Sequence, residues 1–294
     1  MSAEGTEGRI LLFGAGGQLG QALRRLLSAR RDVVGLAHAD CDVGDPAAVR
    51  AAIAAAAPSI IINAAAYTAV DRAEDEPDRA YAANAVAPGV MAEEARRRGA
   101  VFVHYSTDYV FDGQGRTPYR EDDPAAPLGV YGASKRAGEE RVAGAGGIFY
   151  ILRTAWLYDR QGRNFLTTME RLGRERAQTG RPLTVVADQW GSPTSVAALA
   201  AATEGILGHA GIRELSGIYH ATCGGETTWW GFAQAILEGL HIPAAVTPIT
   251  TADYPTRARR PAYSVLSSAR LDRVFGIHMP QWEAALRSCL QAGA

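Results

Sequence analysis

The chain is almost without lysine. Of its 30 lysine and arginine residues, Lys135 is the single lysine and the other 29 are arginine. A sequence with this bias has used arginine wherever a positive charge alone was enough. Arginine does not replace lysine where a compact ammonium group is needed, because the guanidinium is a broad planar fork. Lys135 is therefore a candidate for a role in chemistry.

Other scarcities exclude several classes of protein. The three cysteines, Cys41, Cys223 and Cys289, lie far apart and predict free or buried thiols in a reducing compartment. No apolar run approaches the roughly 20 residues of a membrane-spanning helix, and Ile10–Phe13 is too short for a secretion signal. A net charge of −1 gives no pull towards nucleic acid or an anionic membrane. The six histidines include no His-x-x-x-His pair, and we predict no metal site. We expect a cytoplasmic enzyme or binding protein.

A glycine-rich turn follows the first apolar run. The run at 9–13 is followed by Gly14-Ala-Gly-Gly-Gln-Leu-Gly20 and then by an amphipathic pattern, which predicts a strand, a turn and a helix. Gly14, Gly17 and Gly20 allow a sharp turn, close approach of a pyrophosphate to the helix N-terminus, and packing of helix on strand. Leu19 stands where G-x-G-x-x-G would have its last glycine, so the spacing fits a Gly-x-x-Gly-x-x-Gly variant.

The end of the second expected strand, Val33–Leu36, bears on the choice of cofactor. An acid that holds the ribose 2′-hydroxyl of NAD would be expected here, but Ala37 and His38 follow instead. Ala37 does not repel a 2′-phosphate and His38 can contact one, so the sequence favours NADPH and leaves NADH open. Asp42 can accept from the adenine amino group and Val43 can pack on the ring. The alternative for Asp42 is an ordinary turn residue before a helix.

Short apolar runs alternate with helical patterns through the first half of the chain. Ile60–Asn63, Val101–Tyr105 and Ile148–Leu152 are typical of buried strands. Residues 64–68 are expected to continue the first of these, and helices are expected over 75–83 and 88–98. This alternation predicts an α/β fold, a Rossmann-type doubly wound parallel sheet.

The alternation loosens beyond residue 163. We therefore expect residues 1–155 to form mainly the dinucleotide-binding domain. Residues 156–294 are expected to form mainly a small C-terminal substrate-binding α/β cap, with segments that return to the sheet.

Tyr131 precedes Lys135 by four residues. If a helix begins near residue 130, both side chains lie on one face. An ammonium beside a phenol stabilises the phenolate, so we expect Lys135 to lower the pKa of Tyr131 and fit it for proton transfer. The alternative is a surface lysine on a helix. Because Lys135 is the only lysine, the sequence favours the chemical role.

With these pieces assembled, the chain resembles the extended short-chain dehydrogenase/reductase family along nearly its full length. Within that family it is most similar to reductases of dTDP-linked 4-keto-sugars. The resemblance rests on Asn63-Ala-Ala-Ala-Tyr-Thr-Ala-Val-Asp71, His104-Tyr-Ser-Thr-Asp-Tyr-Val-Phe-Asp-Gly113, Val130-Tyr-Gly-Ala-Ser-Lys135, Leu152-Arg-Thr-Ala-Trp156 and Ala258-Arg-Arg-Pro261. It implies reduction of dTDP-4-dehydro-L-rhamnose to dTDP-L-rhamnose with NAD(P)H.

The resemblance also implies residue roles. Tyr131 would protonate the C4 oxygen as hydride reaches C4, Lys135 would bind the nicotinamide ribose, and Thr107 would hydrogen-bond the carbonyl. The residues expected at the dinucleotide are Gly14, Gly17, Gln18, Leu19, Gly20, Ala37, His38, Asp42, Val43, Ala65, Ala66, Tyr67, Thr68, Tyr131 and Lys135. Those expected at the substrate are Val70, Thr107, Asp108, Tyr109, Trp156, Arg259 and Arg260. Trp156 could instead be core, and the arginines could be surface charges or ion pairs.

Some relatives dimerise around magnesium through acidic residues, one of them in the first helix. Ala22 stands at the matching position, so a metal-bridged dimer is not expected, and a monomer and a homodimer both stay open.

Three rival functions remain. Dehydratases of this family carry Thr-Asp-Glu at the strand end, whereas here Tyr109 follows Asp108, which argues against dehydration. A ketoreductase or epimerase for another dTDP-sugar is not separated by sequence. A regulatory subunit, like the β subunit of methionine adenosyltransferase, would not need a tuned phenol, so Thr107, Tyr131 and Lys135 favour an enzyme.

Overall fold

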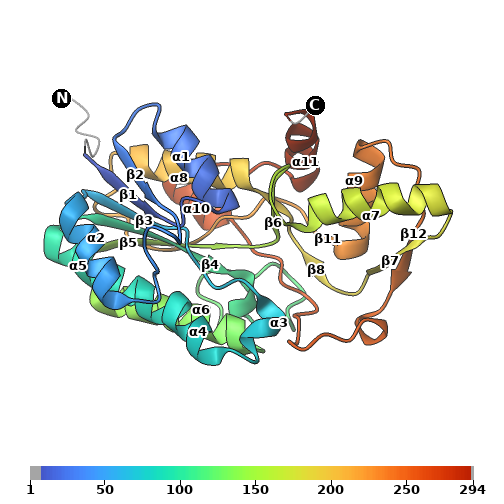
Figure 1. Ribbon diagram of the computed structural model, residues 1–294, viewed down its shortest axis with the longest axis horizontal. Coiled ribbons are helices and arrows are strands. Elements are labelled where there is room, and N and C mark those ends of the chain that lie inside the picture. Colours follow the sequence, from blue (N-terminus) through green and yellow to red (C-terminus); the bar gives the residue numbers. More distant parts are fainter. Residues whose placement is uncertain (1–7, 293–294) are drawn as a thin grey trace.

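The computed structural model describes residues 8–292, and its centre is a six-stranded sheet in which every strand pair is parallel (Figure 1). The strands are β1 (Ile10–Phe13), β2 (Val33–Leu36), β3 (Ile60–Asn63), β4 (Val101–Thr107), β5 (Ile148–Thr154) and β10 (Gly217–His220), in the spatial order β10-β5-β4-β3-β1-β2. The chain starts at β1, runs outward to β2, and returns to β3 on the other side. The crevice at this reversal, beyond the carboxyl ends of β1 and β3, is where ligands bind in such sheets.

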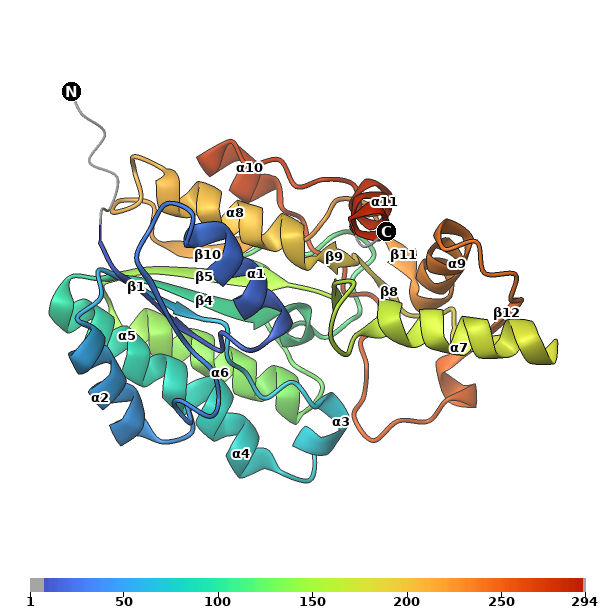
Figure 2. The same cartoon turned by 45° about the horizontal axis from the view of Figure 1, so that its top comes forward.

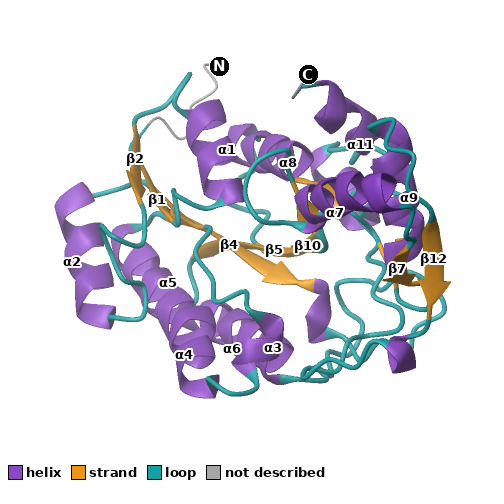
Figure 3. Cartoon of the chain, turned by 45° about the vertical axis from the view of Figure 1, so that its right-hand side comes forward, coloured by secondary structure: helices purple, strands orange, loops and turns teal. Residues whose placement is uncertain are grey.

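Helices cover both faces of the sheet (Figure 3). One face carries α1 (Gln18–Leu27), α8 (Val196–Gly208) and α10 (Ala269–Phe275); the other carries α2 (Pro46–Ala56), α5 (Ala87–Arg98) and α6 (Val130–Ala145). Successive side chains of a strand point to opposite faces. Leu12 accordingly packs with Leu23 of α1, whereas Leu11 packs with Ile53 of α2. The predicted doubly wound Rossmann-type sheet is confirmed.

A smaller α/β unit lies beside the carboxyl ends of the strands (Figure 2). Its helices are α7 (Phe165–Thr179), α9 (Trp229–Gly239) and α11 (Trp282–Gln291), and its paired strands are β6 (Leu157–Tyr158) with β9 (Thr194–Ser195), β7 (Leu183–Val186) with β12 (Val246–Ile249), and β8 (Trp190–Gly191) with β11 (Thr227–Thr228). Its core is built around Phe232, Ile236 and Trp282. The same half of the chain also supplies α8, α10 and β10 to the larger unit.

The segment between β3 and β4 differs from the sequence-based expectation. The strand ends at Asn63, and residues 64–68 form a loop, so the expected continuation of the strand was wrong. The helical region consists of α3 (Val70–Ala73), α4 (Pro77–Tyr81) and a π-helical turn (Ala82–Val86) that leads directly into α5. Single π turns inside helices are frequent at functional sites. Two short 3₁₀ turns complete the elements, at Asp108–Val110 and Thr251–Asp253.

Candidate active site

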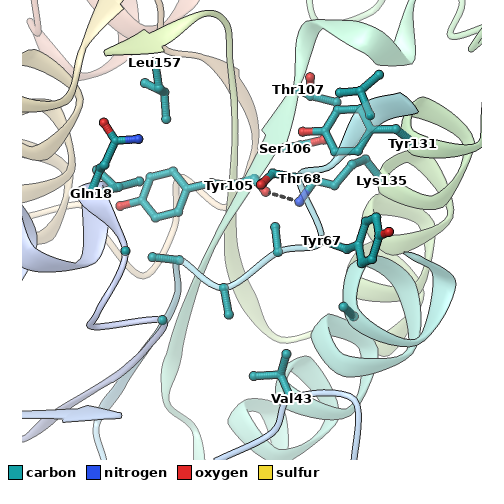
Figure 4. Close-up of a pocket in the computed structure, with 18 of the residues that line it drawn as sticks. Gln18, Val43, Tyr67, Thr68, Tyr105, Ser106, Thr107, Tyr131, Lys135 and Leu157 are labelled. Carbon is teal, nitrogen blue, oxygen red and sulfur yellow. Dashed lines mark hydrogen bonds between the residues drawn. The ribbon is translucent and has the colours of Figure 1, made fainter. Parts of the chain in front are cut away.

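A cavity of about 1380 Å³ opens at the carboxyl ends of β1, β3, β4 and β5 (Figure 4). Pockets for a single small ligand typically measure roughly 300–1,000 Å³, so this cavity is larger than one such ligand needs. Nearly all of the residues predicted from the sequence line it, and so do Arg163, Asn164 and Trp229 from the second half of the chain. Two predicted residues, Gly20 and Arg259, do not line it.

The glycine turn has the close packing that the sequence predicted. Gly14 has a left-handed φ of 78°, and a Cβ there would lie 2.5 Å from the backbone nitrogen of Ala65. A Cβ on Gly20 would lie 2.0 Å from the carbonyl oxygen of Gly14, so glycine at this position allows α1 to pack closely on the turn. Gly17 is the N-cap of α1, and its cap position leaves helix N–H groups facing the cavity for a phosphate.

The end of β2 carries no acidic side chain at residues 37 and 38. Ala37 and His38 both line the cavity, and the backbone N–H of Ala37 donates to Asp40 at 2.8 Å. Asp42 also lines the cavity, with one carboxylate oxygen accepting from the N–H of Gly44 at 2.9 Å. Asp42 thus closes a turn and also borders the cavity, where its contact with adenine stays a prediction.

Asn84, which the sequence analysis missed, joins the loop at 64–68 to helix α6. Its side chain is fully buried in the π-helical turn; it accepts from the N–H of Tyr67 at 2.9 Å and donates to the carbonyl of Tyr67 at 3.0 Å. It also donates to Ser134 of α6 at 3.1 Å, and Ser134 donates to the carbonyl of Tyr131 at 2.8 Å. The only signal in the sequence was an asparagine within a run of alanines.

Helix α6 presents Tyr131 and Lys135 to the cavity, as expected from their spacing. The first turn of the helix is held by Glu74, which accepts from the backbone N–H of Val130 at 2.8 Å. Figure 4 shows Tyr131 beside Thr107, with Lys135 below it on the same wall. The three predicted catalytic residues therefore meet at one place.

Gly132 sets how closely α6 approaches the turn at 108–110. A Cβ on Gly132 would lie 2.2 Å from the carbonyl oxygen of Tyr109, so a substitution must move the helix or the turn. Gly132→Ala is expected to cost about 1–3 kcal/mol in the free energy of unfolding, measured by urea denaturation, and to lower turnover by displacing Tyr131.

Gly144→Ala, in the same helix with open space around it, is the matched control. Removal of a helical glycine should add roughly 0.5–1 kcal/mol there. Equal stability of the two variants would show that the contact at Gly132 is not restrictive.

The pKa of Tyr131 differs from the prediction. It is raised above its ordinary value, chiefly by burial, with Asp108 and Tyr109 adding to the rise and the Thr107 hydroxyl opposing it. The expectation that Lys135 lowers this pKa was wrong, because Lys135 does not contribute to the shift. The Tyr131 phenol therefore stays protonated well above neutrality.

Lys135 directs its amine into the protein as well as towards the cavity. The side chain is 2% exposed, and Nζ donates to the backbone carbonyl of Tyr105 (Figure 4) and lies 3.4 Å from Nε2 of His104. Burial lowers the pKa of Lys135 to about 8, although Glu139 works in the opposite direction. A broad guanidinium would not fit between these two partners.

The predicted substrate side of the cavity contains Val70, Thr107, Asp108, Tyr109 and Arg260. Burial raises the pKa of Asp108 to about 6, while the hydroxyls of Ser264 and Thr107 oppose this shift.

Arg260 forms an ion pair with Asp71 at 2.7 Å and lies 3.4 Å from the Tyr109 hydroxyl. It also lines the cavity, so it is both an ion-pair residue and a pocket residue. Arg259 is exposed and outside the cavity, which removes the basis for its predicted contact.

Trp156 is a cavity residue and not plain core. Its backbone has a left-handed φ of 48°, uncommon outside glycine. The indole stacks on Trp229 with ring centroids 3.5 Å apart, and a Cβ on Gly191 would lie 2.5 Å from it. Two elements of the smaller unit thus fix the orientation of Trp156, and neither Trp229 nor Gly191 had a distinguishing signal in the sequence.

A polar clasp joins the glycine turn to the start of α7. Asn164 donates to the side-chain oxygen of Gln18 at 2.7 Å, and Gln18 donates to the carbonyl of Arg163 at 3.3 Å. The clasp closes one end of the cavity over the predicted phosphate site. Sequence analysis identified Gln18 but not its partners, which lie about 145 positions later.

Comparison with known proteins decides the family. The model of the family described as "RmlD substrate binding domain" matches residues 8–294. The chain belongs to the RmlD family of dTDP-4-dehydrorhamnose reductases. This confirms the resemblance to reductases of dTDP-linked 4-keto-sugars that the sequence motifs indicated.

Three similar proteins illustrate the RmlD family. A dTDP-4-dehydrorhamnose reductase of Burkholderia thailandensis is 44% identical over 297 residues, covering 96% of this chain and 98% of its own. A protein of Streptomyces antibioticus, named "probable dTDP-4,6-dihydroxy-2-methyloxan-3-one 4-ketoreductase", is 45% identical over 282 residues, covering 95% and 93%. The structure of a Bacillus anthracis dTDP-4-dehydrorhamnose reductase in complex with NADP has a TM-score of 0.91 and 37% identity, covering 97% and 99%.

Two further predictions concern the cysteines and membrane-spanning helices. Cys41, Cys223 and Cys289 are free thiols, as predicted. Among residues 8–292, no helix combines the length and apolar character needed to cross a membrane.

Proposed function

We propose that the protein reduces the C4 keto group of a dTDP-linked sugar, converting dTDP-4-dehydro-L-rhamnose to dTDP-L-rhamnose with NADPH. The observation that carries this proposal is the meeting of Tyr131, Lys135 and Thr107 on the wall of one large cavity, in a chain 44% identical to a reductase of that name. The intact trio also favours an enzyme over a regulatory subunit.

In the proposed reaction the bound nicotinamide supplies the hydride. Tyr131 gives its phenolic proton to the C4 oxygen, and its raised pKa keeps that proton available at neutral pH. The Thr107 hydroxyl donates to Asp108 at 3.0 Å in the structure. On substrate binding it would turn its proton to the same C4 oxygen as negative charge develops there. Lys135, one helical turn beyond Tyr131, holds the ribose and returns a proton to the phenolate, directly or through a hydroxyl bound between them. A reduction consumes one proton, and these groups supply it.

The cavity suits a dinucleotide along the wall that the larger unit provides. The glycine turn and the N-terminus of α1 would hold the pyrophosphate, Val43 and Asp42 the adenine, and the loop at 64–68 the ribose. We propose that residues 1–155 mainly bind this cofactor. Residues 156–294 mainly bind the sugar nucleotide through Trp156 and its neighbours, while α8, α10 and β10 complete the sheet domain. The free thiols fit a cytoplasmic location.

NADPH is expected to bind at least as tightly as NADH, because neither Ala37 nor His38 repels a 2′-phosphate. Titration of the quenching of tryptophan fluorescence would measure both dissociation constants. In Ala37→Asp, a carboxylate at the strand end should weaken NADPH binding and favour NADH, whereas the uncharged Ala37→Asn serves as its control. Tighter binding of NADH by the unmodified protein would contradict this prediction.

A second candidate is reduction of a different dTDP-keto-sugar, which the 45% identity to the Streptomyces antibioticus ketoreductase favours. A panel of dTDP-linked 4-keto-sugars, assayed by loss of NADPH absorbance and by product NMR, distinguishes the two. The highest kcat/KM should fall on dTDP-4-dehydro-L-rhamnose. A higher value on another sugar would reassign the substrate, and no turnover on any of them would reject the reductase proposal.

A further inference from the structure

His104 lies directly behind the amine of Lys135. It is fully buried in β4, with its ring stacked on Phe102 at 6.2 Å between centroids and 14° between planes. It does not line the cavity, so it touches neither substrate nor cofactor. Burial and the charge of Lys135 hold the pKa of His104 well below its usual range. The imidazole is therefore neutral, with one ring nitrogen that donates and one that accepts.

Asn63, at the end of β3, determines which nitrogen carries the proton. Its side-chain oxygen accepts from the backbone N–H of Ala65 at 3.1 Å, so its NH₂ group must be the part that faces His104. That nitrogen lies 3.2 Å from Nδ1 of His104. Because the amide donates there, Nδ1 accepts, and the proton of the neutral ring sits on Nε2.

Nε2 of His104 lies 3.4 Å from Nζ of Lys135. An N–H group at this position can donate to the lone pair of a neutral amine, but it directs positive charge at an ammonium. A line of hydrogen bonds runs from Ala65 through Asn63 and His104 to Lys135. Every donor in this line therefore has an acceptor only when Lys135 has lost its proton. Buried polar networks that are incompletely satisfied are costly.

We propose that His104 is a positioning residue whose Nε2–H group donates to the neutral amine of Lys135 and so favours release of the proton that Lys135 carries. Burial of Lys135 also favours loss of this proton, and the His104 N–H adds a directed contribution that the neighbouring charged side chains do not supply. Glu139, one turn further along α6, favours the ammonium, but its carboxylate is taken up by Arg153 at 2.8 Å and Arg136 at 3.1 Å. Tyr131 is an uncharged phenol.

The consequence for catalysis, which rests on the proposed function, is that the pKa of Lys135 lies closer to the pH at which the protein works. A general acid works best when its pKa lies near the working pH. Burial lowers the pKa of Lys135 to about 8, and the hydrogen bond from His104 acts in the same direction. Without His104 the amine would hold its proton more tightly and return it to Tyr131 more slowly. In the pH profile of kcat/KM for a variant without His104, the alkaline decline should therefore move to higher pH, and the plateau value of kcat/KM should fall.

The single lysine allows a direct measurement. Protein labelled with [ε-¹³C]lysine gives one lysine side-chain resonance, whose titration reports Lys135 without substrate or cofactor. The midpoint should lie near pH 8 in the unmodified protein. In His104→Gln the amide can turn its oxygen towards the ammonium, so the midpoint should rise by at least about one pH unit.

His220 provides the matched control, because it is a second fully buried histidine in the same sheet, with Arg153 as its neighbour. His220→Gln should leave the Lys135 midpoint unchanged. An unchanged midpoint in His104→Gln, or an equal rise in both variants, would overturn the proposal.

The tautomer of His104 gives a test that needs no folded variant. ¹⁵N NMR of the unmodified protein should show His104 with its proton on Nε2, and a proton on Nδ1 would refute the proposal. Both NMR measurements use the free protein. Failure to reduce any dTDP-keto-sugar would therefore reject the proposed function and leave the assignment of His104 intact. A negative NMR result would reject the assignment of His104 and leave the proposed function intact.

Discussion

Tyr131→Phe is expected to lower kcat by roughly 10²- to 10⁴-fold, the usual contribution of a positioned general acid. The substitution removes one oxygen and keeps the ring, which packs edge-on against Tyr109 with centroids 5.6 Å apart. The dissociation constant of NADPH should change little, because in our proposal the glycine turn and the loop at 64–68 hold most of the cofactor. Stopped-flow measurement of NADPH oxidation in single turnover would isolate the chemical step.

Tyr81→Phe is the control for this substitution, because Tyr81 lies exposed at the end of α4. Its turnover should match that of the unmodified protein. If Tyr131→Phe also retained full single-turnover rates, Tyr131 would be removed from the proposed mechanism.

Lys135→Arg is expected to lower kcat/KM on the order of 100-fold, the scale for loss of one essential donor. The charge is conserved, but the guanidinium cannot reproduce a single amine between the Tyr105 carbonyl and His104. NADPH binding should weaken as well, because the ribose loses its donor. Steady-state kinetics combined with a fluorescence titration of NADPH would measure both effects.

The reciprocal substitution at the next residue, Arg136→Lys, tests whether the loss of kcat/KM is specific to position 135. Arg136 is partly exposed on the same helix and is paired with the buried Glu139 and the exposed Glu140, and lysine can make those ion pairs too. Its kcat/KM should be unchanged. Near-normal activity in Lys135→Arg would mean that a positive charge alone suffices at position 135.

Much of the site could be predicted because its signals are local. The glycine turn, the spacing of Tyr131 and Lys135, and Thr107 at a strand end each depend on a few consecutive residues. Parallel strands bring their carboxyl ends to one edge, so the predicted residues converge in one cavity once the strand order is known. Arg259 lies outside the cavity because adjacent residues of an irregular loop point in different directions. Of these two arginines, only Arg260 pairs with Asp71 and lines the cavity.

The pKa of Tyr131 could not be predicted because a pKa depends on burial in three dimensions. The four-residue spacing correctly predicted a shared cavity wall, but it contained no information on what stands behind Lys135. Tyr105 and His104 of β4 engage the amine, and the packing of Asp108, Tyr109 and Thr107 determines the shift of the phenol.

The sequence by itself determined the parallel sheet, the glycine turn and the placement of Thr107, Tyr131 and Lys135 at element ends, because periodicity and short spacings specify elements and their ends. Only the tertiary structure decided the clasp from Gln18 to Asn164, the stacking of Trp156 on Trp229, and the line from Asn63 through His104 to Lys135. The members of these contacts lie between about 30 and 150 positions apart. Which of them meet depends on the packing of whole elements.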